Sequence, residues 1–330
     1  MANQDRVLVT GVTGFVGSHI AENLAEHGYE VAGLIRRTSS LKFIQHLDID
    51  LRVADLADRE GLREIVSDVD YVIHPAGLIK ARSLDEFMAV NRGGTEYILD
   101  SVAKFRPKLK RFVYVSSQAA AGPSEPEKPT TEDMTPSPVS DYGRSKLAGE
   151  EVCGEYSEKL PITILRPPAV FGPRDAGTFP FFKMAKSGWY WKLGKDENYA
   201  SVVYIKDLAE AVRLSLESDA DTSGTFFISN REAPSFWELQ KLIARLMKVE
   251  VRPLYTPFWL AYVMAHLDAF ASVMLSRERN LSKDKLAELT KRYWICDPSK
   301  AERVFGWRAE TPLEQGIRET IDWYIENRWL

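Results

Sequence analysis

Short apolar runs separated by longer amphipathic stretches recur along the first half of the chain. Four of these runs are predicted to be strands: Arg6–Thr10, Glu30–Ile35, 49–53 and Arg111–Val115. Runs that are apolar nearly throughout are typical of parallel strands covered on both faces. Residues 18–27 have the composition of a helix that Gly28 ends. This alternation of strand and helix predicts an α/β fold with a doubly wound parallel (Rossmann) sheet.

The pattern loosens after Phe171, where aromatic residues accumulate from position 179 to position 191. We expect a smaller C-terminal substrate region there, at the carboxyl edge of the sheet; ordinary core of a smaller domain is the alternative. Two later apolar runs, 202–205 and 226–229, are predicted to return to the main sheet. The expected division is a dinucleotide-binding Rossmann domain of residues 1–175 plus 201–230 and a substrate-binding region of residues 176–200 plus 231–330.

The first predicted strand runs directly into a glycine-rich turn, Gly11-Val12-Thr13-Gly14-Phe15-Val16-Gly17. Glycines let the backbone turn tightly and approach a pyrophosphate, and the start of a helix supplies unpaired N–H groups and a positive dipole end. The turn therefore predicts a dinucleotide site whose contacts are Gly11, Thr13, Gly14, Phe15, Val16 and Gly17. Because the spacing is G-x-x-G-x-x-G, the alternative is a strand–turn–helix that needs left-handed turn residues for other reasons.

The end of the second strand distinguishes NAD from NADP, because an acid there binds the ribose 2′-hydroxyl whereas an arginine favours a 2′-phosphate. Arg36 and Arg37 follow this strand, and no acid occurs before Asp48. We therefore expect NADP(H), with NAD(H) as the second choice and a solvated basic loop as the alternative. Asp55 and Leu56 close the next strand, where they are positioned to bond an adenine amino group and cover the ring; a plain strand end is the alternative.

Tyr142 and Lys146 stand four residues apart on a helix that Asp141 is predicted to cap. Moving a hydride between a nicotinamide and a carbinol carbon requires a partner for the hydroxyl proton. A free phenol has a pKa of about 10. An ammonium about 4 Å away contributes about 4 kcal/mol at an effective dielectric of about 20, which would bring the pKa of the phenol near neutrality. Ser117 ends the preceding strand and would bond the substrate oxygen; an exposed helical pair is the alternative reading of Tyr142 and Lys146.

Six ordered motifs make the chain similar to the extended short-chain dehydrogenase/reductase family, also called NAD-dependent epimerases/dehydratases. The similarity covers essentially the whole chain, and its motifs are Thr10 to Gly17, His74-Pro75-Ala76-Gly77, Asn91-Arg92-Gly93-Gly94-Thr95, Val115-Ser116-Ser117 with Gly122, Tyr142-Gly143-Arg144-Ser145-Lys146 and Arg166 to Pro173. The resemblance implies that Tyr142 is the acid/base, that Lys146 holds the nicotinamide ribose and acts electrostatically, and that Ser117 bonds the substrate hydroxyl.

The resemblance also extends the candidate contacts. Asn91 is expected to support the structure beside the lysine, and the 167–170 segment is expected to line the nicotinamide. To the cofactor site the resemblance adds Ala76, Tyr142, Lys146, Pro167 and Val170. To the substrate site it assigns Lys80, Ser117, Tyr142 and Phe171.

Two enzyme classes within this family compete. The late motifs Tyr293 to Asp297 and Phe305-Gly306-Trp307 resemble the 3β-hydroxysteroid dehydrogenase and dihydroflavonol reductase branches, which act on hydrophobic ring ketones or alcohols. We expect an NAD(P)-dependent oxidoreductase of that kind. The stretch Gly77-Leu78-Ile79-Lys80-Ala81 instead resembles nucleotide-sugar epimerases, which retain NAD. A sugar diphosphate would need cations, and the candidates are Arg174, Lys183, Lys186, Lys192 and Arg213. Dinucleotide-sensing regulators on this fold typically lack the tyrosine or the lysine, so the presence of both favours an enzyme.

The composition of the chain limits the partners, metal sites and cell compartment that we expect. The chain has 330 residues, enough for a large core, and its net charge of −4 leaves no nucleic-acid footprint. The two cysteines, Cys153 and Cys296, lack metal-ligand spacing, so we expect free thiols in a reducing compartment and no metal. The first predicted strand begins almost at once, without a secretory segment, so we expect a cytoplasmic protein with a small-molecule substrate.

One apolar stretch, residues 257–275, is ambiguous because His266 and Asp268 interrupt it. A membrane-spanning helix needs about 20 apolar residues and tolerates charge poorly. We expect no integral membrane segment here, but a helix packed over the substrate pocket, with peripheral membrane contact as the alternative. Family members often pair through a four-helix bundle, so a homodimer is expected by analogy.

Overall fold

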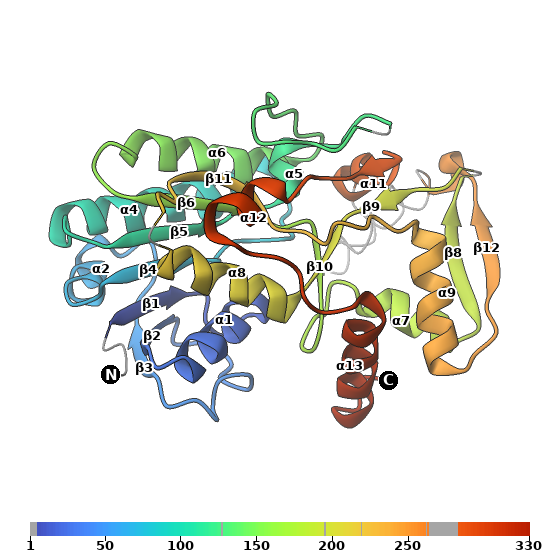
Figure 1. The fold of residues 1–330 in the computed structure, drawn as a ribbon, viewed down its shortest axis with the longest axis horizontal. Helices are drawn as coiled ribbons and strands as arrows, with labels where there is room; N and C mark the ends of the chain where they lie inside the picture. The colour runs from blue at the N-terminus through green and yellow to red at the C-terminus, as the bar shows by residue number, and fades with distance from the viewer. Residues whose placement is uncertain (1–4, 127, 195, 219, 262, 264–282) are drawn as a thin grey trace.

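Seven parallel strands form the main sheet, in the order β11-β6-β5-β4-β1-β2-β3 (Figure 1). The structure is a computed structural model that describes residues 5–126, 128–194, 196–218, 220–261, 263 and 283–330. The strands of the sheet are β1 (Arg6–Thr10), β2 (Glu30–Ile35), β3 (Asp50–Val53), β4 (Tyr71–His74), β5 (Arg111–Val115), β6 (Ile162–Arg166) and β11 (Gly224–Phe227). The predicted α/β fold with a doubly wound parallel sheet is confirmed.

Helices cover both faces of this sheet (Figure 1). One face carries α2 (Arg59–Val66), α4 (Gly93–Phe105) and α6 (Asp141–Tyr156). The other carries α1 (Phe15–Glu26) and α8 (Ile205–Glu217). Neighbouring residues of a strand enter different cores, since Leu8 packs on the first face whereas Val7 and Val9 pack on the second. Burial on both faces explains the nearly continuous apolar runs of β1, β2, β4 and β5, whereas the edge strand β3 is mostly exposed.

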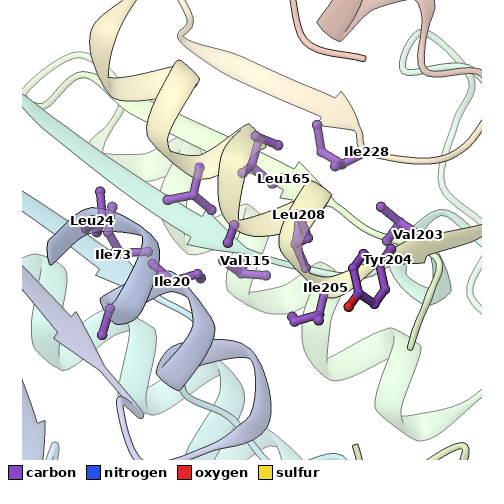
Figure 2. Close-up of a cluster of buried hydrophobic side chains, with 14 of the residues drawn as sticks. Ile20, Leu24, Ile73, Val115, Leu165, Val203, Tyr204, Ile205, Leu208 and Ile228 are labelled. Carbon is purple, nitrogen blue, oxygen red and sulfur yellow. The ribbon is translucent and has the colours of Figure 1, made fainter. Parts of the chain in front are cut away.

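The core beneath α1 and α8 is continuous. Figure 2 shows that α1 contributes Ile20 and Leu24, β4 contributes Ile73, and α8 contributes Leu208 to the same cluster, which also includes Val115 of β5. All of these side chains are buried. The cluster fixes α1 on the sheet, and so it fixes the position of the glycine-rich turn from which α1 starts.

The order of the strands reverses between β1 and β4. From β1 the chain winds outward to β2 and β3, and then it returns to β4, β5 and β6 on the other side. In open α/β sheets a ligand binds at such a switch point, outside the carboxyl ends of the strands. The glycine-rich turn follows β1, and residues 75–77 follow β4, so both lie at this point.

The remainder of the chain forms three two-stranded parallel sheets and additional helices. The sheets pair β7 (Ala169–Phe171) with β10 (Val202–Tyr204), β8 (Trp189–Leu193) with β12 (Arg252–Thr256), and β9 (Tyr199–Ala200) with β13 (Tyr293–Trp294). The longer helices are α7 (Phe179–Lys186), α9 (Phe236–Met247), α11 (Lys283–Leu289), α12 (Ser299–Phe305) and α13 (Leu313–Glu326). The short ones are α3 (Leu84–Phe87), the π-helix η1 (Met88–Arg92) and α5 (Gln118–Ala121). In Figure 1, α9, β8 and β12 lie at the opposite end of the molecule from α2 and α4.

Three local predictions are wrong. The run at 202–205 does not join the main sheet, because β10 pairs with β7 and α8 begins at Ile205; the later run, as β11, does join it. Helix α1 begins at Phe15 rather than at 18, since Gly14 is extended and acts as the N-cap. Ser140, not Asp141, caps α6, because its backbone is extended and its hydroxyl accepts the Gly143 N–H at 3.0 Å.

Residues 264–275, most of the predicted pocket helix, lie outside the described residues. The division into two domains stays a prediction. Within the described part of the chain, no helix combines the length and the apolar character that crossing a membrane would require.

Gly17→Ala should destabilise the fold by about 1–3 kcal/mol, because a Cβ at this position would lie 2.2 Å from the Gly11 carbonyl oxygen and force α1 away from the turn. The matched control is Gly154→Ala in α6, where a Cβ would meet nothing within 4 Å. That variant should gain up to about 1 kcal/mol from helix propensity. Urea unfolding of both variants measures the difference, and equal stabilities would refute the close approach.

Candidate active site

The glycine-rich turn offers the start of α1 to an anion. No side chain caps this helix, and its first turn contains no acid. Gly11 has a φ of +61°, and a Cβ there would lie 3.1 Å from the Cα of Ala76, so the turn lies directly against the end of β4. Beside the exposed Gly14, a Cβ would meet only the Gly11 carbonyl oxygen. Open backbone N–H groups at a helix start fit the pyrophosphate of a dinucleotide.

The neighbouring strand ends place the expected adenosine contacts on the same edge of the sheet. Arg36 and Arg37 follow β2 and are exposed, and neither forms an ion pair with a described residue. The Arg36 N–H donates to the Ser39 hydroxyl at 3.0 Å, which shapes the turn. Asp55 accepts the Ala57 N–H at 2.9 Å, and Leu56 packs near Gly94. Both guanidinium groups are therefore available for a phosphate.

Ser117 and Tyr142 come together because α5 and the start of α6 approach closely. Ser117 caps α5 and accepts the Ala119 N–H at 3.1 Å. A Cβ on Gly143 would lie 2.3 Å from the Ala119 carbonyl oxygen, so only glycine permits this approach. As a result the Ser117 hydroxyl lies close enough to the Tyr142 phenol to lower the pKa of that phenol. The structure thus joins the predicted serine and tyrosine.

Lys146 lies one turn further along α6 and is buried. Its ammonium donates to the Val115 carbonyl oxygen at 2.7 Å and lies 4.3 Å from the centre of the Tyr114 ring. Burial lowers the pKa of Lys146 to about 8, while the charge of Glu150 raises it. The ammonium is thus still mostly protonated at neutral pH.

The pKa of Tyr142 does not move as the sequence argument predicted. Burial raises it to about 12; the nearby Ser117 hydroxyl lowers it, and the charge of Glu288 raises it further. The prediction of a phenol near neutrality is wrong for this structure, because desolvation outweighs stabilisation of the phenolate. At neutral pH Tyr142 therefore keeps its proton.

A buried ion pair beneath these residues was not anticipated from the sequence. Arg166, at the end of β6, donates to Glu150 of α6 through Nε at 2.9 Å and through Nη2 at 2.5 Å. Ser116 also donates to Glu150 at 2.5 Å. The sequence contained a hint of a buried charge pair, since Glu150 stands four residues after Lys146 and Arg166 ends a buried strand. Only the tertiary structure shows that Glu150 and Arg166 pair with each other.

Asn91 ties the loop after β4 to α6. Its side-chain oxygen accepts the Leu78 N–H at 2.7 Å, and its Nδ2 donates to the Leu78 carbonyl at 3.0 Å and to the Ser145 hydroxyl at 2.8 Å. It belongs to the π-helix η1, and such turns are frequent at functional sites. The same loop carries Lys80, which is exposed. Asn91 therefore contributes through positioning, as expected.

The other predicted contacts separate into two groups. Pro167 lies beside α5, because its carbonyl accepts the Gln118 N–H at 2.8 Å, and Val170 is half-buried in β7. Phe171 is only 6% exposed and packs on Tyr204 in the core, and its contact with a substrate stays a prediction. No group of three or more His, Cys, Asp or Glu among the described residues is arranged to hold a metal ion.

A shallow hollow with an enclosed volume of about 40 Å³ lies among α7, β8, α9 and α11. Its apolar lining is mostly aromatic: Phe181, Tyr190, Trp191, Leu193, Phe236, Trp237 and Leu289. Its polar lining is Lys192, Asp196, Glu197 and Asn198. Tyr142 does not line it, but α11 contacts both places, because Leu289 lines the hollow and Glu288 accepts the Ser140 hydroxyl at 2.7 Å. The reactive residues and the hollow are therefore neighbours across α11.

Known proteins similar to this chain share its length and fold. A ceramide reductase from Caulobacter vibrioides is 28% identical over 98% of this chain and 96% of its own. A decarboxylating sterol-4-alpha-carboxylate 3-dehydrogenase from Dictyostelium discoideum is 25% identical over 95% and 99%. The solved UDP-glucuronic acid 4-epimerase from Bacillus cereus in complex with NAD superposes with a TM-score of 0.79 at 22% identity, over 98% of this chain and all of that one.

The family model for the NAD dependent epimerase/dehydratase family matches residues 7–228, which include the glycine-rich turn, Ser117, Tyr142 and Lys146. Members of this family are NAD(P)-dependent dehydrogenases, reductases or epimerases. The match covers more than half of the chain and agrees with the fold and with the arrangement of strand ends around the turn. The chain belongs to the NAD dependent epimerase/dehydratase family.

Proposed function

We propose that this chain is an NADP(H)-dependent dehydrogenase or reductase that acts on a secondary alcohol or ketone of a hydrophobic, ring-containing lipid. The observation that carries the proposal is the hollow beside α11, whose apolar lining is mostly aromatic. Aromatic side chains offer a large apolar surface to such a substrate. Full-length similarity to a ceramide reductase and to a sterol dehydrogenase supports a lipid substrate.

In this proposal Tyr142 transfers the hydroxyl proton. A nicotinamide bound beside the glycine-rich turn would supply or accept the hydride. Because the phenol keeps its proton at neutral pH, Tyr142 is equipped to donate that proton to a ketone oxygen during reduction. Ser117, close to the phenol, would hold the same oxygen within reach.

Lys146 would bind a ribose hydroxyl and keep a positive charge near the phenol. One N–H of its ammonium is used by the Val115 carbonyl, which leaves two donors for a ligand. During oxidation the positive charge would favour the phenolate, which then accepts the substrate proton. The pair with Val115 fixes the ammonium at the carboxyl end of β5, where the substrate oxygen is expected.

A nucleotide-sugar epimerase is the second candidate, and Lys192 in the lining of the hollow is the observation that favours it. Lys192 already pairs with Glu197 at 2.6 Å, and Arg174 pairs with Glu22 at 3.0 Å. Arg213 likewise pairs with carboxylates of its own helix. A diphosphate at these three cations would have to displace their partners. Lys183 and Lys186 form no ion pair with a described residue, but they do not line the hollow, so this candidate ranks second.

Tyr142→Phe should lower turnover by about 10²–10⁴-fold while the Kd for NADP(H) stays unchanged, because the variant removes only the proton donor. Tyr156→Phe is the matched control, since Tyr156 lies on the same helix and bonds to Asp100 outside the site. Steady-state kinetics and calorimetry measure the two effects. Near-normal turnover of the Tyr142 variant would refute the assignment.

Arg36→Ala should weaken NADP(H) binding by about 10- to 150-fold, the value of one charge-assisted contact, and leave NAD(H) binding unchanged. Lys108→Ala removes an exposed charge near the opposite end of β5 and should change neither. Calorimetry with both dinucleotides on each protein tests this. Equal affinity of the wild type for NAD(H) and NADP(H) would contradict the preference.

Sterols and other ring-containing keto or hydroxy lipids should raise the unfolding temperature of the NADP(H) complex, and their conversion should change the nicotinamide absorbance. UDP-sugars should do neither, because Lys192, the cation that lines the hollow, is paired with Glu197. A thermal-shift screen of both classes, followed by absorbance assays of the hits, decides between them. Stabilisation by a UDP-sugar alone, with turnover but no net absorbance change, would reverse the order of the two candidates.

A further inference from the structure

Half of the large apolar side chains exposed on the described surface gather at one end of the molecule. Six of the twelve come from β8, β12 and the residues that follow β12: Trp189, Leu254, Tyr255, Phe258, Trp259 and Val263. We call these six residues the aromatic end. Trp259 is 67% exposed and Tyr255 is 61% exposed. In Figure 1, β8 and β12 lie at the far end of the substrate region from the main sheet. Exposed apolar clusters of this kind mark interaction surfaces.

The charges around the aromatic end are mostly positive. Exposed cations without an ion-pair partner among the described residues are Lys183, Lys186, Lys248 and Arg252. The β8–β12 register places Arg252 opposite Trp189. Glu250 is the one exposed carboxylate between residues 247 and 261, and Asp196, three residues after β8, is exposed as well. A positive end on a chain whose net charge is −4 suits a negatively charged partner.

We propose that the aromatic end docks on the surface of an anionic lipid bilayer. Tryptophan and tyrosine prefer the depth of the lipid headgroups, and lysine and arginine beside them bind anionic headgroups. Membrane-surface segments combine these two residue types on one face. A second copy of this chain suits the surface less well, because a two-fold contact would bring the two sets of cations together.

Strand β8 connects the aromatic end to the candidate substrate hollow. Trp189 is exposed at the aromatic end, while the next two residues, Tyr190 and Trp191, line the hollow. Strand β8 thus carries aromatic residues both at the aromatic end and in the lining of the hollow, on alternating faces. This link rests on the proposed function, whereas the docking itself does not.

Co-sedimentation of the full chain with vesicles tests the docking. Vesicles of phosphatidylglycerol mixed with phosphatidylcholine should bind the protein, vesicles of phosphatidylcholine alone should bind it less, and added salt should weaken the binding. Leu254→Ser/Trp259→Ser and Lys186→Glu/Arg252→Glu should each lower the partition coefficient by at least about tenfold. Ile325→Ser on α13, whose side chain is 56% exposed, and Lys108→Glu are the matched controls and should bind as the wild type does.

Two results would overturn the docking: vesicle binding that both double variants retain, or no binding by the wild type. A concentration-dependent dimer that Leu254→Ser/Trp259→Ser abolishes would assign the surface to a second copy instead.

Turnover of a detergent-dispersed lipid separates this proposal from the proposed function. If turnover persists without vesicle binding, the docking fails alone; if vesicles bind but only UDP-sugars are converted, the proposed function fails alone. Unchanged unfolding temperatures of the variants confirm that each still folds.

Discussion

The buried ion pair between Glu150 and Arg166 holds the candidate site together. It joins α6, which carries Tyr142 and Lys146, to the end of β6, the strand next to the edge strand β11 of the main sheet. Removing one partner of such a pair leaves an uncompensated charge in the core and typically costs about 3–5 kcal/mol. Ser116 adds a bond to the same carboxylate, so the residue before Ser117 is fixed by the same pair.

From that anchor, close backbone approaches set the remaining geometry. Gly143 lets α6 rest on α5, which places the Tyr142 phenol on Ser117, and Gly17 lets α1 rest on its own turn. Burial then decides the protonation states. The phenol is held neutral, whereas the ammonium of Lys146 loses part of its hydration but keeps a carbonyl, an aromatic face and the nearby carboxylate. The site therefore contains a protonated phenol, Tyr142, and a protonated ammonium, Lys146, on the same helix.

The substrate region adds an apolar hollow to the Rossmann sheet. Leu289 of α11 lines this hollow, and the neighbouring Glu288 accepts a hydrogen bond from Ser140 at the start of α6. Aromatic residues also extend along β8 to the outer surface. This arrangement suits a substrate whose reactive oxygen is small and polar while the rest of the molecule is apolar.

The sequence by itself determined the sheet, the turn and the family. The strands β1, β2 and β5 were predicted at their observed bounds, because burial on both faces leaves unbroken apolar runs, and local glycine spacing revealed the turn. The sequence did not predict the long-range contacts. The Glu150–Arg166 pair, the place of β10 beside β7, the core position of Phe171 and the raised pKa of Tyr142 all depend on which distant segments pack together. Only the tertiary structure decides these features, since desolvation and pairing are properties of the assembled neighbours rather than of any local stretch of chain.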